Sequence, residues 1–349
     1  MSFGKKLSFL TGYLLLLLPV AGFFMGGIYN FLAFFILFTT VPLIDYWVRD
    51  GSNVSTAEEN ALAHDPYFSA IIYLYVPIQS LLLLFSLYAV SHTTLTWYEW
   101  LGYSLSIGLI TGGLGITLAH ELMHKSGKLQ QFLSKSLLVM VCYGHFMIEH
   151  VRGHHVRVAT PDDPASAPLG ISVYRFIPRS VMGSFQSAWH LEKQRLHKKG
   201  FSVHSIHNQF WWIIGAPLLL MIAIFAYGGW LALGFFLLQS FVAIFLLEIV
   251  NYIEHYGLQR KRLANGRYEP VSSLHSWNAN HWLSNVILFH LQRHSDHHAQ
   301  GAKPYQILHH CEESPQLPSG YLGMVMLSLV PPLWFAAMDK RALRYRQNA

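Results

Sequence analysis

Histidines lie in three tight groups along this chain, at spacings that suit a metal ion. HELMHK supplies His120 and His124, EHVRGHH supplies His150, His154 and His155, and LQRHSDHH supplies His294, His297 and His298. Residues four apart project from one face of a helix, one turn from each other, so the histidines of each motif can share an ion. Imidazole is a good ligand for zinc, copper, iron and nickel. The three groups therefore predict a transition-metal site.

The number of imidazoles indicates the number of metals. Zinc or non-haem iron takes about four to six ligands, so these histidines imply two ions. His255 in NYIEHYGL lies at the end of an apolar segment, and we select it as a further ligand. The alternative for His255 is a histidine that hydrogen-bonds a backbone carbonyl at a helix end. Histidines without this close spacing are expected to make hydrogen bonds or to lie at the surface.

A carboxylate stands beside a proposed ligand in each motif. Metal-bound histidines usually donate their second ring nitrogen to a carboxylate or a carbonyl, which favours a supporting role for these residues. Neighbouring residues on a helix point in different directions, so some of them can instead serve the structure or the other metal. A carboxylate that bridges the two metals also remains open. The four residues are Glu121, Glu149, Glu254 and Asp296.

The composition places the chain in a membrane. Of its 349 residues, 52% are hydrophobic and 12% are charged, against about 25% charged residues in average soluble domains. A membrane-spanning helix needs about 20 apolar residues. The sequence predicts six such spans, at about 7–24, 28–47, 68–91, 99–119, 211–229 and 231–250.

The positions of lysine and arginine predict the orientation of the spans. Lys5 and Lys6 precede the first span, Arg49 follows the second, Lys125 follows the fourth and Arg260 follows the sixth. Cytoplasmic loops carry the excess of these residues, so both termini and all histidine groups are expected on the cytoplasmic side. The net charge of +6 fits a basic membrane face and leaves an acidic soluble partner open. No nucleic-acid partner is expected.

We therefore expect an all-α membrane protein with six transmembrane helices and a cytoplasmic, histidine-rich cap. It forms one domain over residues 1–349, with the metal-binding segments in 120–210 and 251–349. Cys142 and Cys311 are its only cysteines. They give no disulfide framework and no iron–sulfur or rubredoxin module.

Taken together, HELMHK, EHVRGHH, NYIEHYGL and LQRHSDHH resemble the motif set of the membrane-bound alkane 1-monooxygenases, non-haem di-iron ω-hydroxylases of bacteria. The resemblance covers nearly the whole chain, and NYIEHYGL and LQRHSDHHA are its most specific parts. Some relatives carry a fused rubredoxin after this region, whereas this chain ends at RYRQNA. The resemblance implies that the iron ligands are His120, His124, His150, His154, His155, His255, His294, His297 and His298.

The resemblance further implies a reaction and its partners. Two iron ions activate O₂, and a medium-chain n-alkane is hydroxylated at its terminal methyl group to a 1-alkanol. Two electrons come from separate reduced rubredoxin, which an NADH-dependent rubredoxin reductase reduces. The expected location is the bacterial cytoplasmic (inner) membrane, in contact with membrane lipid.

An alkane offers no polar group for recognition, so it is bound by burial of methylenes at roughly 0.8 kcal/mol each. A lipid-accessible tunnel between helices would provide such a site, and four residues are candidates for its wall. Ordinary packing between helices is the alternative for each of them, since small residues such as Gly112 also favour close helix contact. The candidates are Leu37, Thr40, Ile110 and Leu114.

Two alternatives compete with alkane hydroxylation. A fatty acyl desaturase or hydroxylase, or a xylene-type methyl hydroxylase, would use the same metal chemistry on another substrate. The sequence contexts of Glu254 and of Gln292–Arg293 favour alkane hydroxylation. A metal transporter belongs to another class, and it would need ionisable residues in mid-span, where this sequence has almost none.

Overall fold

The computed structural model describes residues 3–50 and 53–348, and their regular secondary structure is helical apart from isolated β-bridges. This confirms the predicted all-α class. The elements are α1 (Phe3–Ser8), α2 (Thr11–Met25), η1 (Gly27–Phe31), α3 (Leu32–Phe35), η2 (Ile36–Thr40), α4 (Val41–Trp47), α5 (Thr56–Ala63), α6 (Pro66–His92), α7 (Trp97–Ile110), η3 (Thr111–Ile116), α8 (Thr117–Met123), α9 (Lys128–Val139), α10 (Phe146–Glu149), η4 (His150–His154), α11 (His155–Arg157), α12 (Val173–Lys198), α13 (Phe210–His255), η5 (Ser273–His275), α14 (Trp282–Ile287), α15 (His294–Ala299), η6 (Tyr305–Ile307), α16 (Tyr321–Ser328) and α17 (Pro331–Asn348).

The chain folds into two compact units, each assembled from three separate segments. The first unit consists of Met1–Thr40, His64–Met147 and Glu192–Leu247. The second consists of Val41–Ala63, Ile148–Leu191 and Glu248–Ala349. The expectation of a single domain over the whole chain stays a prediction.

Five helical stretches of the described residues are long and apolar enough to cross a membrane. They are Phe3–Met25, Gly27–Trp47, Pro66–His92, Trp97–Met123 and Phe210–His255. The first four contain the first four predicted spans. The chain is thus a multi-pass membrane protein.

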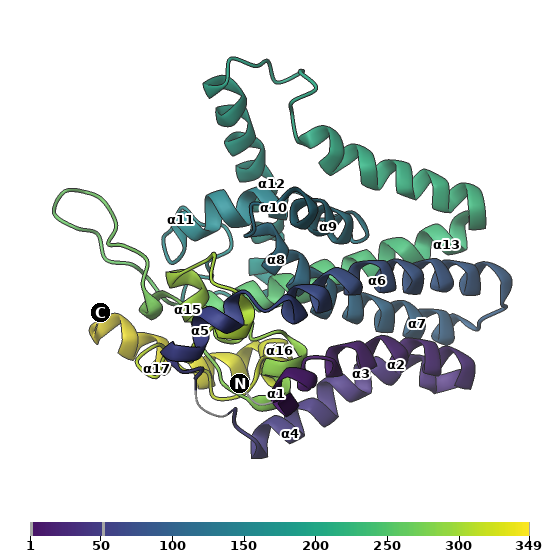
Figure 1. Cartoon of the computed structure of the whole chain (residues 1–349), viewed down its shortest axis with the longest axis horizontal. Helices are drawn as coiled ribbons and strands as arrows, with labels where there is room; N and C mark the ends of the chain where they lie inside the picture. The colour runs from purple at the N-terminus through teal and green to yellow at the C-terminus, as the bar shows by residue number, and fades with distance from the viewer. Residues whose placement is uncertain (1–2, 51–52, 349) are drawn as a thin grey trace. The chain divides into compact units, whose positions relative to one another are not determined.

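The fifth stretch holds both remaining predicted spans within one assigned helix, α13. A straight helix of 46 residues would be about 69 Å long, more than twice the roughly 30 Å of a hydrocarbon core. Gly229 interrupts α13 with φ 63° and ψ −155°, a backbone conformation that is essentially restricted to glycine. Figure 1 accordingly shows α13 bent into two arms.

Close backbone contacts hold the long helices of the first unit together. A Cβ atom on Gly108 would lie 2.6 Å from Cβ of Val242, and one on Gly112 would lie 2.7 Å from Cα of Ala243. Small residues in α7 and η3 therefore let α13 approach, as is common between membrane helices.

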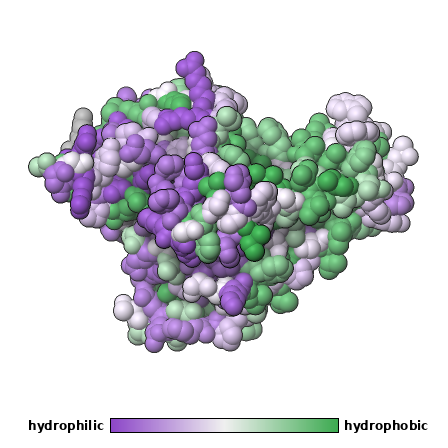
Figure 2. Space-filling view, turned by 90° about the horizontal axis from the view of Figure 1, so that it is seen from above, coloured by the Kyte–Doolittle hydropathy of each residue, from purple (hydrophilic) through white to green (hydrophobic). Residues whose placement is uncertain are grey.

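The outer surface of this unit is apolar. Leu81 on α6 is 64% exposed and Phe241 on α13 is 61% exposed. In Figure 2 the hydrophobic side chains, in green, cover these helices toward the right of the view. Exposing these apolar side chains to water would cost free energy, whereas contact with lipid avoids this cost.

Aromatic packing and buried polar contacts organise the second unit. The ring of Trp334 on α17 lies 5.0 Å from that of Tyr252 and 5.2 Å from that of Tyr256, between centroids. Nε1 of Trp277 donates to the Tyr256 carbonyl at 2.8 Å. The ring contacts fix the end of α13, which carries His255, against α17, and the hydrogen bond of Trp277 fixes it against the segment between η5 and α14.

Candidate metal centre

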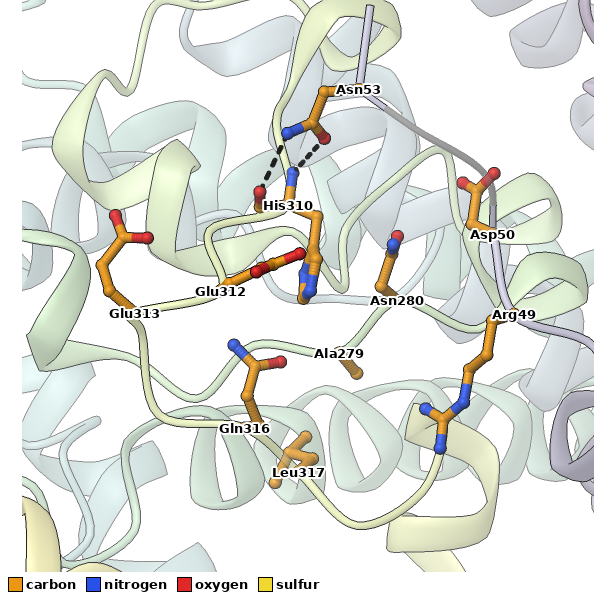
Figure 3. A pocket seen from close by; sticks show the side chains of 10 residues that line it. All are labelled: Arg49, Asp50, Asn53, Ala279, Asn280, His310, Glu312, Glu313, Gln316 and Leu317. Carbon is orange, nitrogen blue, oxygen red and sulfur yellow. Dashed lines mark hydrogen bonds between the residues drawn. The ribbon is translucent and has the colours of Figure 1, made fainter.

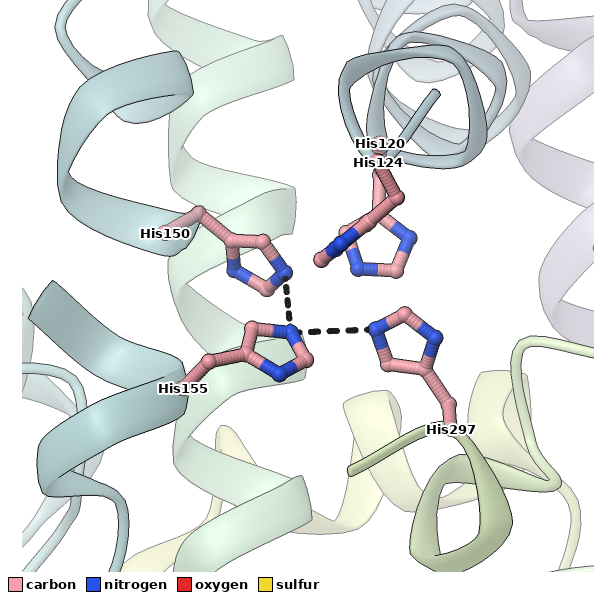
Figure 4. A group of neighbouring side chains, drawn as sticks. All are labelled: His120, His124, His150, His155 and His297. Atoms are coloured by element: carbon pink, nitrogen blue, oxygen red, sulfur yellow. Dashed lines mark hydrogen bonds between the residues drawn. The ribbon is translucent and has the colours of Figure 1, made fainter. Parts of the chain in front are cut away.

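His120 and His124 lie at the end of α8 in the first unit. Their ring centroids are 5.1 Å apart, as expected for two residues one helical turn apart. A side chain from α9 binds the last carbonyl of this helix and one just beyond it, because Nε2 of Gln131 donates to Met123 O at 3.0 Å and to Lys125 O at 2.6 Å. Both imidazoles therefore project from a well-supported helix end, which Figure 4 shows.

The second histidine motif forms a π-helical turn, η4, in the second unit. In such a turn residue i bonds to residue i+5, so side chains five apart share a face. Nε2 of His150 accordingly lies 3.0 Å from Nε2 of His155. Sequence spacing alone paired His150 with His154, on the assumption of an ordinary α-helix. The rings of His150 and His154 are also neighbours, with centroids 5.2 Å apart, but each residue lies in a different group of histidines.

The first of these groups, within the second unit, consists of His150, His155 and His297. Nε2 of His155 lies 3.0 Å from Nε2 of His150 and 3.1 Å from Nε2 of His297, and Figure 4 shows His155 between them. One ring nitrogen carries either one proton or one lone pair, so ordinary hydrogen bonds do not account for both contacts. Two nitrogens bound to one metal at about 2.0–2.1 Å lie about 2.8–3.4 Å apart, which both distances match.

The second group consists of His154, His255, His294 and His298. All four side chains are buried, and one ring nitrogen from each lies within 4.8 Å of the others. Nε2 of His298 lies 2.9 Å from Nε2 of His294 and 3.2 Å from Nε2 of His154. This group brings together residues from α13, η4 and α15, and it includes His255, which the sequence analysis selected from NYIEHYGL.

Burial keeps His298 in the protonation state that binds metal. The pKa of His298 is lowered well below its ordinary value, first by burial and then by the charges of neighbouring histidines such as His155 and His294. A neutral imidazole has a lone pair to donate. An all-nitrogen, buried donor set fits a transition metal such as iron or zinc and does not fit calcium or magnesium.

The structure places one predicted carboxylate directly against a histidine. Oε2 of Glu254 lies 3.2 Å from Nε2 of His294, on the same nitrogen that faces His298. Glu254 is 3% exposed. It is therefore placed to support a metal bound by the four-histidine group or to contact that metal itself.

The other three predicted carboxylates have cationic partners. Glu121 pairs with Lys125 at 2.9 Å, Glu149 with Arg157 at 2.6 Å and Asp296 with Lys303 at 2.8 Å. Burial raises the pKa of Glu149 to about 7, although the hydrogen bond of Ser187 and the charge of Arg157 oppose this. Supporting roles for these three residues stay predictions.

Asp163 is a further residue of the site that the sequence analysis did not select. Its side chain is fully buried, and Oδ2 accepts a hydrogen bond from Nδ1 of His154 at 2.8 Å. No periodic pattern in the sequence marks this residue, because it lies in an irregular loop.

The four candidates for the tunnel wall lie in or beside π-helical turns of the first unit. Leu37 is buried and Thr40 is exposed in η2, while Ile110 and Leu114 are buried at the junction of α7 and η3. π-helical turns often mark functional sites. A tunnel along these residues stays a prediction.

A polar cavity of about 820 Å³ lies in the second unit, and Figure 3 shows its lining. Charged residues such as Arg49, Glu312 and Glu313 exclude it as an alkane site. His310 on its wall accepts a hydrogen bond from Nδ2 of Asn278 at 2.6 Å, and Oδ1 of Asn278 accepts one from Ser295 Oγ on α15 at 3.0 Å. The cavity wall thus supports the helix that carries His294, His297 and His298.

Closely spaced histidine groups in a multi-pass helical chain define a metal-binding membrane protein. Residues 95–328 match the fatty acid desaturase family. The chain is 46% identical over 314 residues to alkane 1-monooxygenase 2 of Pseudomonas aeruginosa, covering 89% of this chain and 83% of that protein. It is 52% identical over 250 residues to alkane 1-monooxygenase 1 of the same organism, covering 71% of this chain and 65% of that protein. It is 41% identical over 314 residues to the alkane 1-monooxygenase of Acinetobacter baylyi, covering 89% of this chain and 76% of that protein.

The chain therefore belongs to the alkane 1-monooxygenases, within the fatty acid desaturase family. This confirms the resemblance that the histidine motifs indicated.

Proposed function

We propose that this protein hydroxylates medium-chain n-alkanes at a terminal methyl group. One oxygen atom of O₂ enters the C–H bond to give a 1-alkanol, and the other leaves as water after uptake of two electrons and two protons. The observation that carries the proposal is the presence of two groups of closely spaced histidines that could hold a metal, in a chain of this family. No other feature of the described residues offers comparable chemistry.

The proposed cofactor is a pair of iron ions. His154, His255, His294 and His298 provide one set of donors, and His150, His155 and His297 contribute to the other. His120 on α8 and His124, directly after it, complete the set of nine ligands. When bound, the irons would supply the activation of O₂ that no amino-acid side chain provides. The protein's own part is to hold these imidazoles neutral and oriented in a buried site.

The substrate would be bound by apolar burial alone. Each methylene contributes roughly 0.8 kcal/mol when it leaves water, and the apolar helices of the first unit provide suitable walls. Leu37, Thr40, Ile110 and Leu114 remain the candidates for that wall. Entry from the lipid phase suits a substrate that is itself concentrated in the membrane.

We propose six membrane crossings, with both termini on the cytoplasmic side of the bacterial inner membrane. The reversal of α13 at Gly229 supports two crossings by that helix. The distribution of lysine and arginine supports the orientation. The histidine motifs then share the cytoplasmic side, where a soluble electron donor has access.

The proposed electron donor is rubredoxin, which is kept reduced by an NADH-dependent reductase. The segment from Lys261 to Tyr268 carries three exposed cations, at Lys261, Arg262 and Arg267. Such a surface favours association with an acidic protein.

Reconstitution tests the proposal. Purified protein with rubredoxin, its reductase, NADH and octane should give 1-octanol by gas chromatography, with about two irons per chain by elemental analysis. His255→Ala should abolish turnover and lower the iron content, while His190→Ala, at an exposed histidine outside both groups, should leave both unchanged. An alkene product would point to a desaturase, turnover of xylene but not octane to a methyl hydroxylase, and bound zinc without iron would refute the oxygenase.

A further inference from the structure

The side chain of Asp163 is enclosed by hydrogen-bond donors on both carboxylate oxygens. Oδ2 accepts from His154 Nδ1 at 2.8 Å and from Ser166 Oγ at 2.6 Å, while Oδ1 accepts from Ala165 N at 3.2 Å. The residue is fully buried. A buried carboxylate with this many donors is held in one orientation. Rotating it would leave a buried hydrogen-bond donor without an acceptor, which costs free energy.

The loop around Asp163 is itself anchored. Ser166 Oγ accepts a hydrogen bond from Ala159 N at 2.8 Å, and Ala159 has a φ of +56°, an unfavourable conformation for a residue with a side chain. The carbonyl of Ala159 accepts from Arg260 N at 2.8 Å. The loop is thus tied to the segment that follows His255, another member of the four-histidine group.

This anchoring determines how His154 can act. A neutral imidazole has one protonated nitrogen and one lone pair, and the hydrogen bond made by one nitrogen decides which is which. With Nδ1–H donating to Asp163, the lone pair is left on Nε2, which lies 3.2 Å from Nε2 of His298. His154 is thereby fixed in the tautomer that offers a ligand to the centre of the four-histidine group.

The support of His255 in the same group is different. Its Nδ1–H donates to the backbone carbonyl of His275 at 3.4 Å, which is a long contact to a neutral acceptor. Hydrogen bonds to charged acceptors are shorter and roughly twice as strong. The carboxylate of Asp163 is therefore the stronger of these two supports.

We propose that Asp163 is a positioning residue that fixes the tautomer and orientation of His154, so that its charge governs metal retention by the four-histidine group and not by the other group. This inference rests on the proposed function, in which both groups hold iron. Supporting carboxylates of metal ligands typically account for a 10–100-fold difference in metal affinity. The expected signature is the selective loss of one metal.

The adjacent residue provides a matched control. Asp163→Asn keeps the side-chain size but removes the charge. Its amide can turn an N–H toward Nδ1 of His154 and so favour the tautomer in which Nε2 carries the proton. Asp162→Asn makes the same change one residue earlier, at an exposed position. Purified full-length variants would be dialysed against a graded series of chelator concentrations, and iron per chain would be measured together with the thermal unfolding midpoint.

Asp163→Asn should lose about half of its iron at a chelator concentration 10–100-fold lower than the wild type requires. The remaining iron should be retained as in the wild type, and Asp162→Asn should match the wild type throughout. Co²⁺ titration, followed by the visible bands of the bound ion, should show one weakened and one unchanged site. This readout does not depend on hydroxylation.

Unchanged iron retention in Asp163→Asn would overturn the inference, and so would equal loss of both irons. Ser166→Ala serves as a second variant if Asp163→Asn does not fold. It removes one donor to the carboxylate but keeps the charge, and a smaller loss confined to one metal is expected. A wild type that binds two irons yet forms no 1-octanol would refute the proposed function while leaving this result interpretable, whereas a wild type without iron would refute both.

Discussion

Arg293 and Asp50 form a buried ion pair in the second unit, with Nη2 2.9 Å from Oδ2. Arg293 also donates to Leu308 O at 2.6 Å and to Asn280 Oδ1 at 3.1 Å, and its side chain is fully buried. The residue that follows is His294, the first histidine of α15. A single guanidinium thus connects the start of α15 to three other segments, one of which lies directly after α4.

Replacement of Arg293 by Met should destabilise the protein strongly, because Asp50 would keep a buried charge without its cation. Removing one partner of a buried pair typically costs about 3–5 kcal/mol. The double variant Arg293→Met with Asp50→Asn should recover part of this loss. Chemical unfolding in detergent would measure the free energies, with Arg344→Met, at an exposed site, as a control expected to stay within about 0.5 kcal/mol of wild type.

Gly229→Ala should disturb the reversal of α13. The φ of 63° and ψ of −155° at this position would strain any residue with a Cβ atom by about 1–3 kcal/mol. Gly215→Ala lies on the same helix, where a Cβ meets no atom within 4 Å, and it should be neutral or slightly stabilising. Thermal unfolding and the yield of membrane-inserted protein would compare the two, and equal behaviour would argue against a required turn at Gly229.

Glu254→Gln should weaken the four-histidine group, because Glu254 Oε2 lies 3.2 Å from Nε2 of His294. A loss of about 10–100-fold in metal affinity or hydroxylation rate is expected for a support of this kind. Glu313→Gln, at an exposed carboxylate on the polar cavity, should behave as wild type. Iron content and the rate of 1-octanol formation are the measurements, and retention of both in Glu254→Gln would remove this residue from the site.

His281 should make the protein less stable as the pH falls. Its folded-state pKa is lowered to about 4, first by burial and then by the charges of Arg49 and His310. The unfolded chain binds the proton near pH 6.5, so stability declines as the pH falls from about 6.5 toward 4 and levels off below that.

Comparison with His281→Gln isolates this contribution. The unfolding midpoint of the wild type should fall more steeply between pH 6.5 and 4.5 than that of the variant, because the variant lacks this titrating group. The remaining slope of the variant reports other buried histidines. Parallel curves for the two proteins would contradict the assignment.

The sequence by itself determined the type of metal ligand in this protein and its location in a membrane. Repeated histidines indicate imidazole ligands wherever the fold places them. Long apolar stretches indicate membrane-spanning helices however these pack, so both features can be predicted from the sequence. His255 was also accessible, because its motif could be compared with a known family. Each of these features depends on residue type and local spacing.

Tertiary structure decided which histidines lie close enough to share an ion and which groups hydrogen-bond to them. A π-helical turn pairs His150 with His155, although an ordinary helix would pair His150 with His154, and the register of backbone hydrogen bonds is not encoded by spacing alone. Asp163 meets His154 because an irregular loop folds back, a contact without any sequence period. Local patterns identify the donors, but only the folded backbone sets the distances of about 3 Å that let nitrogens share a metal.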